Sequence, residues 1–288
     1  MADTLVKPLM AGLIGTGIRA SLTPAMHMEE GRAQGFSYAY ELIDLAARNL
    51  SPDALPRLLD DAEARGFVGL NITHPCKQLV IPHLDDLSPE ARAIGAVNTV
   101  VFKDGRRYGH NTDWWGFAES FRGGLSGVNM TAAVQIGAGG AGVATAYAIL
   151  SLGLRHLTVF DRDDERSEQL AAAMSRLFPA ATIVAGDDLA SAMGAASGLI
   201  HATPTGMENY PGLPLPAELL APHHWVAEIV YFPLETELLR QARAIGCRTL
   251  IGGGMAVFQA VGAFRLLTGH EPDVTRMRHH FDRMTTAH

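Results

Sequence analysis

The chain has 288 residues, of which 48% are hydrophobic and 18% charged, and its formal net charge is −7. That length allows two domains with cores of their own, and the composition is that of an ordinary globular protein. Because the acidic balance offers no basic surface for nucleic acid, we expect no nucleic-acid partner and a small-molecule ligand instead.

Targeting, redox and metal signals are weak. The chain has no stretch of about 18 apolar residues, so we expect no membrane partner and a cytoplasmic protein. Cys76 and Cys247 form no C-x-x-C pair, which predicts reduced thiols. The twelve histidines show no H-E-x-x-H spacing, so we predict no metal site.

The first predicted elements are a strand over 10–14 and a helix over 26–34, with Pro24 suited to the first helical turn. Ser21 and Thr23 lie between them. Hydroxyls at that point can cap the helix or hold a substrate carboxylate, and spacing alone favours capping.

The following elements carry polar residues out of apolar runs. Strands are predicted over 36–43 and 67–70, separated by a helix over 53–65, and the second strand leads into the polar cluster 71–77. Parallel sheets build their sites at such an edge. Segments 94–101 and 108–113 are predicted to form a β-hairpin that turns at Asp104-Gly105, and a connecting helix follows over 114–121.

The second half of the chain alternates strand and helix, which predicts a doubly wound parallel sheet. The loop 204–207 either covers a nicotinamide or simply turns the chain. Two last helices, over 255–267 and 274–284, are expected to pack back on the N-terminal domain. The strands are predicted over 131–136, 156–161, 182–185, 198–202, 225–230 and 248–250.

A glycine motif of the form G-x-G-x-x-G follows the first of these strands. In this motif Gly137 would make the turn, Gly139 would let a pyrophosphate approach, and Gly142 would let the helix pack on the strand. The helix N-terminus then offers free N–H groups to phosphate. Asp161, at the end of the next strand, is placed to bind the ribose hydroxyls of a dinucleotide.

The residues after that strand bear on the choice of dinucleotide. Asp161, Asp163 and Asp164 would repel a 2′-phosphate, whereas Arg162 could pair with it. The balance of charge favours NAD, with NADP possible.

Seven motifs together identify a family that the chain resembles, the shikimate dehydrogenases, and most of all their quinate/shikimate dehydrogenase branch. They are the glycine turn, Ser21-x-Thr23-Pro24-x-Met26-His27, Asn71-Ile72-Thr73-His74-Pro75-x-Lys77, Gly95-Ala96-Val97-Asn98-Thr99, Asn111-Thr112-Asp113-x-x-Gly116, Ala202-Thr203-Pro204-x-Gly206-Met207 and Met255-x-x-x-Gln259-Ala260.

The resemblance implies an α/β protein of two domains with a cleft between them. An N-terminal α/β substrate domain would comprise residues 1–113, completed by the C-terminal helices 255–288. A doubly wound Rossmann domain for the dinucleotide would comprise residues 114–254.

The resemblance also implies roles for individual residues. Ser21 and Thr23 would bind the substrate carboxylate, which replaces the capping interpretation. Lys77 and Asp113 would be the catalytic pair, and Tyr231 would lie near the carboxylate or the nicotinamide. Ring hydroxyls would be bound by Asn71, Thr73, Asn98, Asp113 and Gln259. The cofactor would be bound by Gly137, Ala138, Gly139, Gly140, Ala141, Asp161, Arg162, Thr203, Met207 and Gly254.

The implied pair suits the implied chemistry. When a secondary alcohol is oxidised, its hydroxyl proton must leave as hydride moves to the nicotinamide, so a base must touch that oxygen. Lys77 and Asp113 are treated as one coupled unit, without assigning the proton to either.

The chain departs from the common family pattern in four places. Thr23 stands where many members have serine, a feature of the quinate-accepting branch. Asp161-Arg162-Asp163 stands where NADP-using members commonly have Asn-Arg-Thr. His201 replaces a common asparagine before Ala202-Thr203, and Thr205 replaces a small or apolar residue.

The leading hypothesis is therefore an NAD(P)-dependent oxidoreductase that interconverts shikimate or quinate with its 3-dehydro form, in aromatic amino acid biosynthesis or quinate catabolism. An NADP-dependent biosynthetic shikimate dehydrogenase, a relative acting on an amino analogue of shikimate, and a non-catalytic NAD-dependent sensor are the alternatives. The expected assembly is a monomer or a homodimer.

Overall fold

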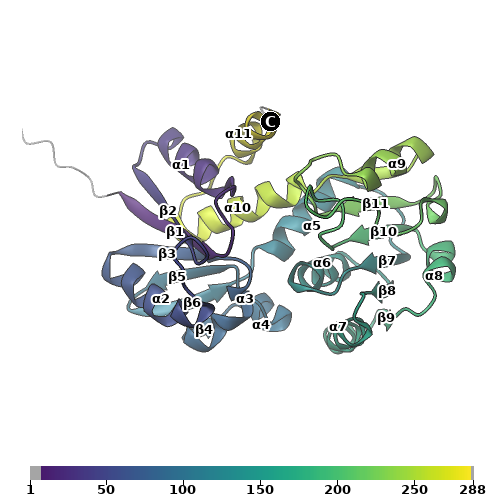
Figure 1. The fold of residues 1–288 in the computed structure, drawn as a ribbon, viewed down its shortest axis with the longest axis horizontal. Coiled ribbons are helices and arrows are strands. Elements are labelled where there is room, and N and C mark those ends of the chain that lie inside the picture. The colour runs from purple at the N-terminus through teal and green to yellow at the C-terminus, as the bar shows by residue number, and fades with distance from the viewer. Residues whose placement is uncertain (1–7, 287–288) are drawn as a thin grey trace, which may run out of the picture. The chain divides into compact units, whose positions relative to one another are not determined.

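The computed structural model describes residues 8–286, and the chain divides into two compact units (Figure 1). Unit 1 consists of Met1–Thr112 and Gln259–His288, and unit 2 of Asp113–Phe258. Each unit contains a six-stranded sheet with helices packed on it. The α/β class predicted from the sequence is confirmed.

The sheet of unit 1 is mixed, with strand order β2-β1-β3-β5-β6-β4. Strand β1 runs parallel to both β2 and β3, whereas β5 runs antiparallel to β3 and to β6, and β4 runs parallel to β6. The carboxyl ends of β1, β2 and β3 therefore lie at one edge. The strands are β1 (Leu9–Gly15), β2 (Tyr38–Asp44), β3 (Phe67–Ile72), β4 (Asp86–Leu87), β5 (Thr99–Lys103) and β6 (Arg106–His110).

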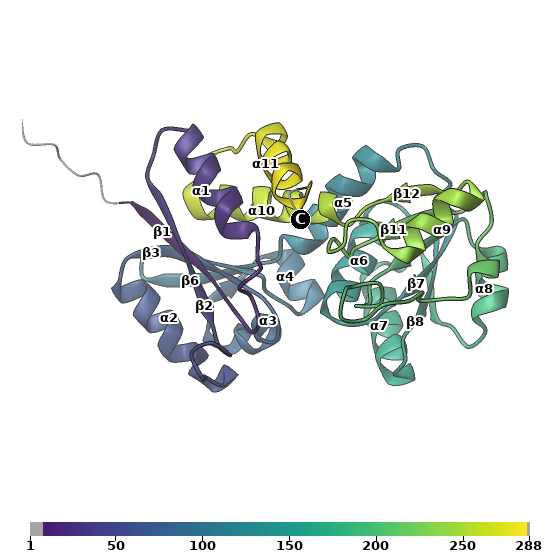
Figure 2. The ribbon, with the colours of Figure 1, turned by 45° about the horizontal axis from the view of Figure 1, so that its top comes forward.

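Helices pack on both faces of this sheet (Figure 2). On one face, Leu55 and Leu59 of α2 are buried against Leu70 of β3. On the other face, Phe264 of α10 is buried against Tyr38 of β2. The helices are α1 (Thr23–Ala33), η1 (Pro52–Ala54), α2 (Leu55–Ala64), α3 (Cys76–Leu79), η2 (Ile81–His83), α4 (Pro89–Ile94), α11 (Val274–Thr286), and α10 (Gly253–Thr268), within which the division between units falls.

The predicted hairpin is present, but it is shorter than expected. Asp104 and Gly105 form its two-residue turn with φ of 53° and 70°, the left-handed values that this turn requires. Residues 94–98 and 111–113 were expected in its two strands and lie outside them. Helix α4 occupies the preceding residues because the Ser88 side chain caps its start, accepting from Ala91 N, and Gly95 ends it with a φ of 69°.

The sheet of unit 2 is entirely parallel, in the order β12-β11-β10-β7-β8-β9. The strand order reverses at β7, and ligands bind at such a switch point in doubly wound sheets. The predicted Rossmann arrangement is thereby confirmed. The strands are β7 (Ala132–Ile136), β8 (His156–Phe160), β9 (Thr182–Ala185), β10 (Gly198–His201), β11 (Trp225–Glu228) and β12 (Arg248–Leu250).

Alternate residues of the unit 2 strands are buried under opposite layers of helices. Ala227 of β11 lies in the same core as Phe117 of α5 and Ile149 of α6, whereas its neighbour Val226 lies in the core that contains Leu238 of α9. The helices are α5 (Asp113–Gly124), α6 (Gly140–Ser151), α7 (Asp164–Leu177), α8 (Leu189–Ala195), η3 (Ala217–Leu219) and α9 (Glu237–Ile245).

Two predictions about the chain as a whole concern cysteines and membranes. Cys76 and Cys247 are both free and buried, as expected for reduced thiols. Across residues 8–286, no helix has the length and apolar character needed to cross a membrane.

Candidate active site

In unit 1, the loops that follow β1 and β3 lie side by side. Thr16 N donates to His74 O at 3.0 Å, and Thr73 N donates to Ile14 O at 2.9 Å. A Cβ at Gly15 would lie 2.3 Å from Cγ2 of Thr73, so glycine lets the two loops approach without displacing that side chain. The sheet edge thus joins the segment that leads to Ser21 with the segment that carries Thr73.

Neither Ser21, which precedes α1, nor Thr23, its first residue, caps the helix. The N-cap residue is Leu22, no side-chain hydrogen bond caps the helix, and the first turn contains Pro24 as expected. Ser21 Oγ accepts only a long bond of 3.4 Å from Thr23 N. The capping favoured by spacing alone is therefore wrong, and both half-buried hydroxyls can serve a ligand.

Asn71, the penultimate residue of β3, is held by three side-chain hydrogen bonds. Its Nδ2 donates to Asn98 O at 3.2 Å and to Thr99 Oγ1 at 2.9 Å, and its Oδ1 accepts from the Tyr40 hydroxyl at 2.7 Å. Burial raises the pKa of Tyr40 well above its usual value, so this hydroxyl stays protonated and donates. The amide orientation is thereby set, and Asn71 can offer a ligand a further acceptor lone pair.

Asn98 is joined to Thr112, and Thr112 is joined to α10. Asn98 Oδ1 accepts from Thr112 N at 2.8 Å, while Nδ2 donates to Thr112 Oγ1 at 2.9 Å. The same hydroxyl donates to Gln259 O at 3.1 Å. The structure thus brings together Asn71, Asn98 and the backbone of Gln259, three predicted positions that are far apart in the sequence.

Tyr40 and Thr112 were not predicted as site residues. Tyr40 gave no motif signal because it lies within an ordinary strand pattern. Thr112 belongs to the motif Asn111-Thr112-Asp113-x-x-Gly116, and its hydroxyl was the signal that could have identified it.

Lys77 and Asp113 belong to different units. Lys77 lies in α3, is half-buried, and its carbonyl accepts from Val97 N at 2.8 Å. Asp113 is the first residue of α5 and is 3% exposed, at a helix end that favours negative charge. Burial raises the pKa of Cys76, the neighbour of Lys77, which fits a packing role for that thiol.

In unit 2, the glycines of the motif have distinct roles. Gly137 has a φ of 111°, and a Cβ at Gly142 would lie 2.1 Å from Gly137 O. By contrast, a Cβ at Gly139 or Gly140 would meet no heavy atom within 4 Å. Turn, helix packing and open approach therefore fall at the glycines where the motif predicts them.

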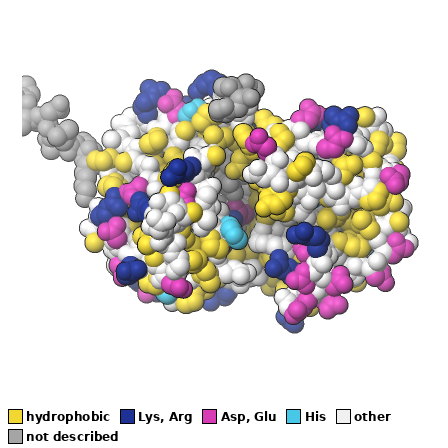
Figure 3. Space-filling view, in the orientation of Figure 1, with side chains coloured by type: hydrophobic (Ala, Val, Ile, Leu, Met, Phe, Trp, Pro, Cys, Tyr) yellow, Lys and Arg dark blue, Asp and Glu magenta, His cyan; other side chains and the backbone are white. Residues whose placement is uncertain are grey.

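The segment after β8 holds its carboxylates in local contacts. Asp161 Oδ2 accepts from Ala138 N at 2.7 Å, and its Oδ1 accepts from Asp163 N at 3.1 Å. Asp163 pairs with Arg166 at 3.2 Å. Arg162 is exposed. Acidic and basic side chains are mixed over the α7 end of this unit (Figure 3).

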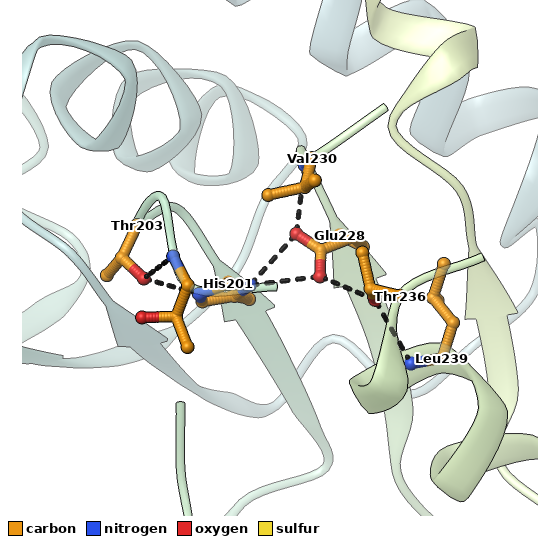
Figure 4. Close-up of polar contacts among 7 residues, drawn as sticks. His201, Thr203, Glu228, Val230, Thr236 and Leu239 are labelled. Atoms are coloured by element: carbon orange, nitrogen blue, oxygen red, sulfur yellow. Dashed lines mark hydrogen bonds and ion pairs between the residues drawn. The ribbon is translucent and has the colours of Figure 1, made fainter. Parts of the chain in front are cut away.

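The remaining predicted cofactor residues follow β10 and β12, and Tyr231, which was predicted to lie near the substrate carboxylate or the nicotinamide, follows β11. Thr203 Oγ1 lies 2.5 Å from Nε2 of the buried His201 (Figure 4). Met207 and Tyr231 are 39% and 36% exposed. Gly254 is buried, and a Cβ there would lie 2.1 Å from Oγ of Ser120 in α5.

Glu228, which binds His201, was missed entirely. It is 1% exposed and accepts from Thr236 Oγ1 at 3.0 Å. Its signal was a single acidic residue inside the apolar run 225–230, since a charge in a central strand is rare without a partner.

A doubly wound sheet with an open glycine turn, and with a carboxylate at the end of the next strand, is typical of a dinucleotide-binding protein. A family model described as the shikimate dehydrogenase substrate binding domain matches residues 13–100. The shikimate dehydrogenase (NADP(+)) of Streptomyces avermitilis is 58% identical over 270 residues, which are 93% of each chain.

Relatives named for the other cofactor match as well. The quinate/shikimate dehydrogenase (NAD(+)) of Corynebacterium efficiens is 49% identical over 273 residues, 94% of this chain and 96% of that one. The structure of quinate dehydrogenase from Corynebacterium glutamicum in complex with NAD superposes with a TM-score of 0.91 at 46% identity, covering 96% of this chain and 99% of that one. The chain belongs to the shikimate dehydrogenase family, which confirms the resemblance drawn from its motifs.

Proposed function

We propose that this protein interconverts shikimate, quinate or both with the 3-dehydro form, with hydride transfer to NAD or NADP. The observation that carries the proposal is the hydrogen-bonded amide network at the edge of unit 1, formed by Asn71, Asn98 and Thr112. Ordered amides and hydroxyls at one sheet edge suit a ring with several hydroxyl groups. The names of the relatives agree with this substrate class.

In this proposal unit 1 is the substrate domain and unit 2 the cofactor domain. Ser21 and Thr23 bind the carboxylate, and their freedom from capping supports that role. Tyr231 lies near the carboxylate or the nicotinamide. The ring hydroxyls bind Asn71, Thr73, Asn98, Asp113 and Gln259.

Lys77 and Asp113 take the proton. When the nicotinamide is bound, it supplies the acceptor for the hydride from the carbon that carries the reacting hydroxyl. Lys77 and Asp113 act on that hydroxyl as one acid–base unit, removing its proton to solvent in oxidation and returning it in reduction. The ammonium form of Lys77 would also stabilise negative charge that develops on the oxygen.

The glycine turn fits a dinucleotide, since the space over Gly139 and Gly140 is open at the N-terminus of α6. Backbone N–H groups of residues 139–141 would hold the pyrophosphate, since those of Gly137 and Ala138 already donate to Phe160 O and to Asp161 Oδ2. Asp161 would accept from the ribose hydroxyls with its remaining lone pairs, which favours NAD. Arg162, Thr203, Met207 and Gly254 complete the proposed contacts.

One assay tests this function and its cofactor together: initial oxidation rates for quinate and for shikimate, each with NAD and with NADP. Turnover with NAD is the expected result. Lys77→Ala should lower kcat by about 10²- to 10⁴-fold, the usual contribution of acid–base catalysis. Lys103→Ala, at an exposed lysine of the β5 hairpin, is the matched control and should keep the wild-type rate. Near-normal turnover by Lys77→Ala would rule out the mechanism.

A second candidate, an NADP-dependent biosynthetic enzyme, is favoured by the segment after β8. Asp161 already accepts two backbone N–H groups and Asp163 pairs with Arg166, while Arg162 is exposed. Arg162 could therefore bind a 2′-phosphate more readily than a count of charges suggests. Turnover of shikimate with NADP alone would select this candidate.

A further inference from the structure

A buried histidine–glutamate pair joins two strand ends of unit 2. His201 and Glu228 are the last residues of β10 and β11 and are directly opposite in the parallel register. His201 Nδ1 lies 2.9 Å and 3.0 Å from the two carboxylate oxygens. The two side chains are 0% exposed. Burying a carboxylate is costly unless its oxygens are hydrogen-bonded, so Glu228 holds its hydrogen-bond partners in fixed positions.

The carboxylate binds the two segments that follow it. Glu228 Oε1 accepts from Val230 N at 2.9 Å, and Oε2 accepts from Thr236 Oγ1 at 3.0 Å. Thr236 is the N-cap of α9 and accepts from Leu239 N (Figure 4). The path of the chain from β11 to α9, which includes Tyr231, is therefore anchored on Glu228.

The hydrogen bonds of the cluster run in one direction. In the neutral imidazole that donates Nδ1–H to the carboxylate, Nε2 is an acceptor, and the Thr203 hydroxyl donates to it; this is the tautomer that the proposal below uses. Thr203 Oγ1 also accepts from Thr205 N at 3.2 Å. The hydroxyl hydrogen of Thr203 thus points toward the interior, and the group can offer a ligand only its remaining lone pair.

Thr203 lies beside the glycine turn. A Cβ at Gly137 would be 2.5 Å from Ala202 O and 3.0 Å from Cγ2 of Thr203. Thr203 is half-buried, so it forms the outer end of a hydrogen-bond chain whose inner end is the fully buried carboxylate.

We propose that His201 and Glu228 are positioning residues of the cofactor half-site, which turn Thr203 into a hydrogen-bond acceptor for the carboxamide N–H of a nicotinamide. The inference rests on the proposed function. Glu228→Leu should reverse the chain, because Nδ1–H of His201 then has no acceptor, whereas the tautomer with Nε2–H can donate to Thr203. Both Thr203 lone pairs would be occupied, leaving it only a donor.

The test compares two cofactors by calorimetry: NAD and its 3-acetylpyridine analogue, which replaces the carboxamide by an acetyl group with no N–H. Their 2′-phosphates are used instead if the enzyme prefers NADP. We expect wild type to bind the analogue about 2- to 12-fold more weakly, the effect of one hydrogen bond. Glu228→Leu and Thr203→Val should bring this ratio close to 1.

Two further variants separate positioning from general damage. His201→Asn introduces the residue that is common at this position in the family and should fold, and its ratio should fall between the wild-type value and 1. His224→Gln changes another buried histidine of unit 2, which binds Ala221 N and Met193 O, and should lower the melting temperature but keep the wild-type ratio.

The outcomes are distinguishable. If wild type binds neither NAD nor NADP, the proposed function fails. If wild type binds cofactor and discriminates against the analogue, and Glu228→Leu, His201→Asn and Thr203→Val all keep its ratio, the positioning proposal is overturned while the proposed function stands. A wild-type ratio of 1 overturns the positioning proposal as well.

Discussion

The two glycines Gly139 and Gly142 belong to one motif, yet replacing each by alanine should affect a different property of the protein. At Gly142 the new methyl would lie 2.1 Å from Gly137 O and 2.8 Å from Gly137 C, both backbone atoms that cannot rotate away. At Gly139 it would meet no heavy atom within 4 Å, and φ there is −74°, which alanine adopts freely. Gly142→Ala should therefore damage the fold, and Gly139→Ala the cofactor site.

The magnitudes follow from the cost of overpacking, about 1–3 kcal/mol. For Gly142→Ala that cost is borne by the folded protein, so the melting temperature should fall by about 2–12 °C at roughly 2–4 °C per kcal/mol. For Gly139→Ala a similar cost arises only when a pyrophosphate is bound, and Kd for the cofactor should rise about 5- to 150-fold. The weaker N-cap should cost Gly139→Ala about 1 kcal/mol at most.

The assay is a thermal unfolding curve and a calorimetric cofactor titration for each variant. Gly194→Ala is the control, because this glycine lies inside α8 and a methyl group added to it would meet no heavy atom within 4 Å. It should stabilise the protein by up to about 1 kcal/mol and leave Kd unchanged. A wild-type Kd for Gly139→Ala would refute the placement of the pyrophosphate, and a wild-type melting temperature for Gly142→Ala would refute the packing argument.

Three further predictions concern unit 1. Arg276→Ala should cost about 1–3 kcal/mol, a buried-pair value reduced for the 39% exposure of Arg276, because it donates to the buried Glu30 at two distances of 2.7 Å. Burial by itself would raise the pKa of Glu30, but these hydrogen bonds lower that pKa below 4.5. In urea unfolding, the stability lost by Arg276→Ala should therefore be full above pH 4.5 and shrink below it. A loss of stability that does not depend on pH would contradict this. Tyr40→Phe should raise KM for the substrate about 2- to 12-fold by removing the bond that orients Asn71, and an unchanged KM would remove Tyr40 from the site. Cys76, with its pKa raised by burial, should react with iodoacetamide only on unfolding, which mass spectrometry of native and urea-treated protein would show; rapid native labelling would count against its packing role.

Local patterns were sufficient to predict much of the architecture. The glycine turn was predictable because each glycine meets a backbone requirement within a few residues, such as the positive φ of Gly137. The alternation of strand and helix likewise predicted the doubly wound sheet of unit 2. The hairpin was predicted too long, because the apolar pattern alone indicated a strand from residue 94. Ser88 instead starts a helix that extends to Ile94.

Contacts between distant side chains were decided only by the tertiary structure. His201 and Glu228 are 27 residues apart and become partners only because β10 and β11 are in register. Tyr40 of β2 reaches Asn71 of β3 because a single strand, β1, lies between their strands in the sheet. Motif and composition identify the residue types that a site needs. The hydrogen-bond partner of each group depends on strand order and register, which no single segment specifies.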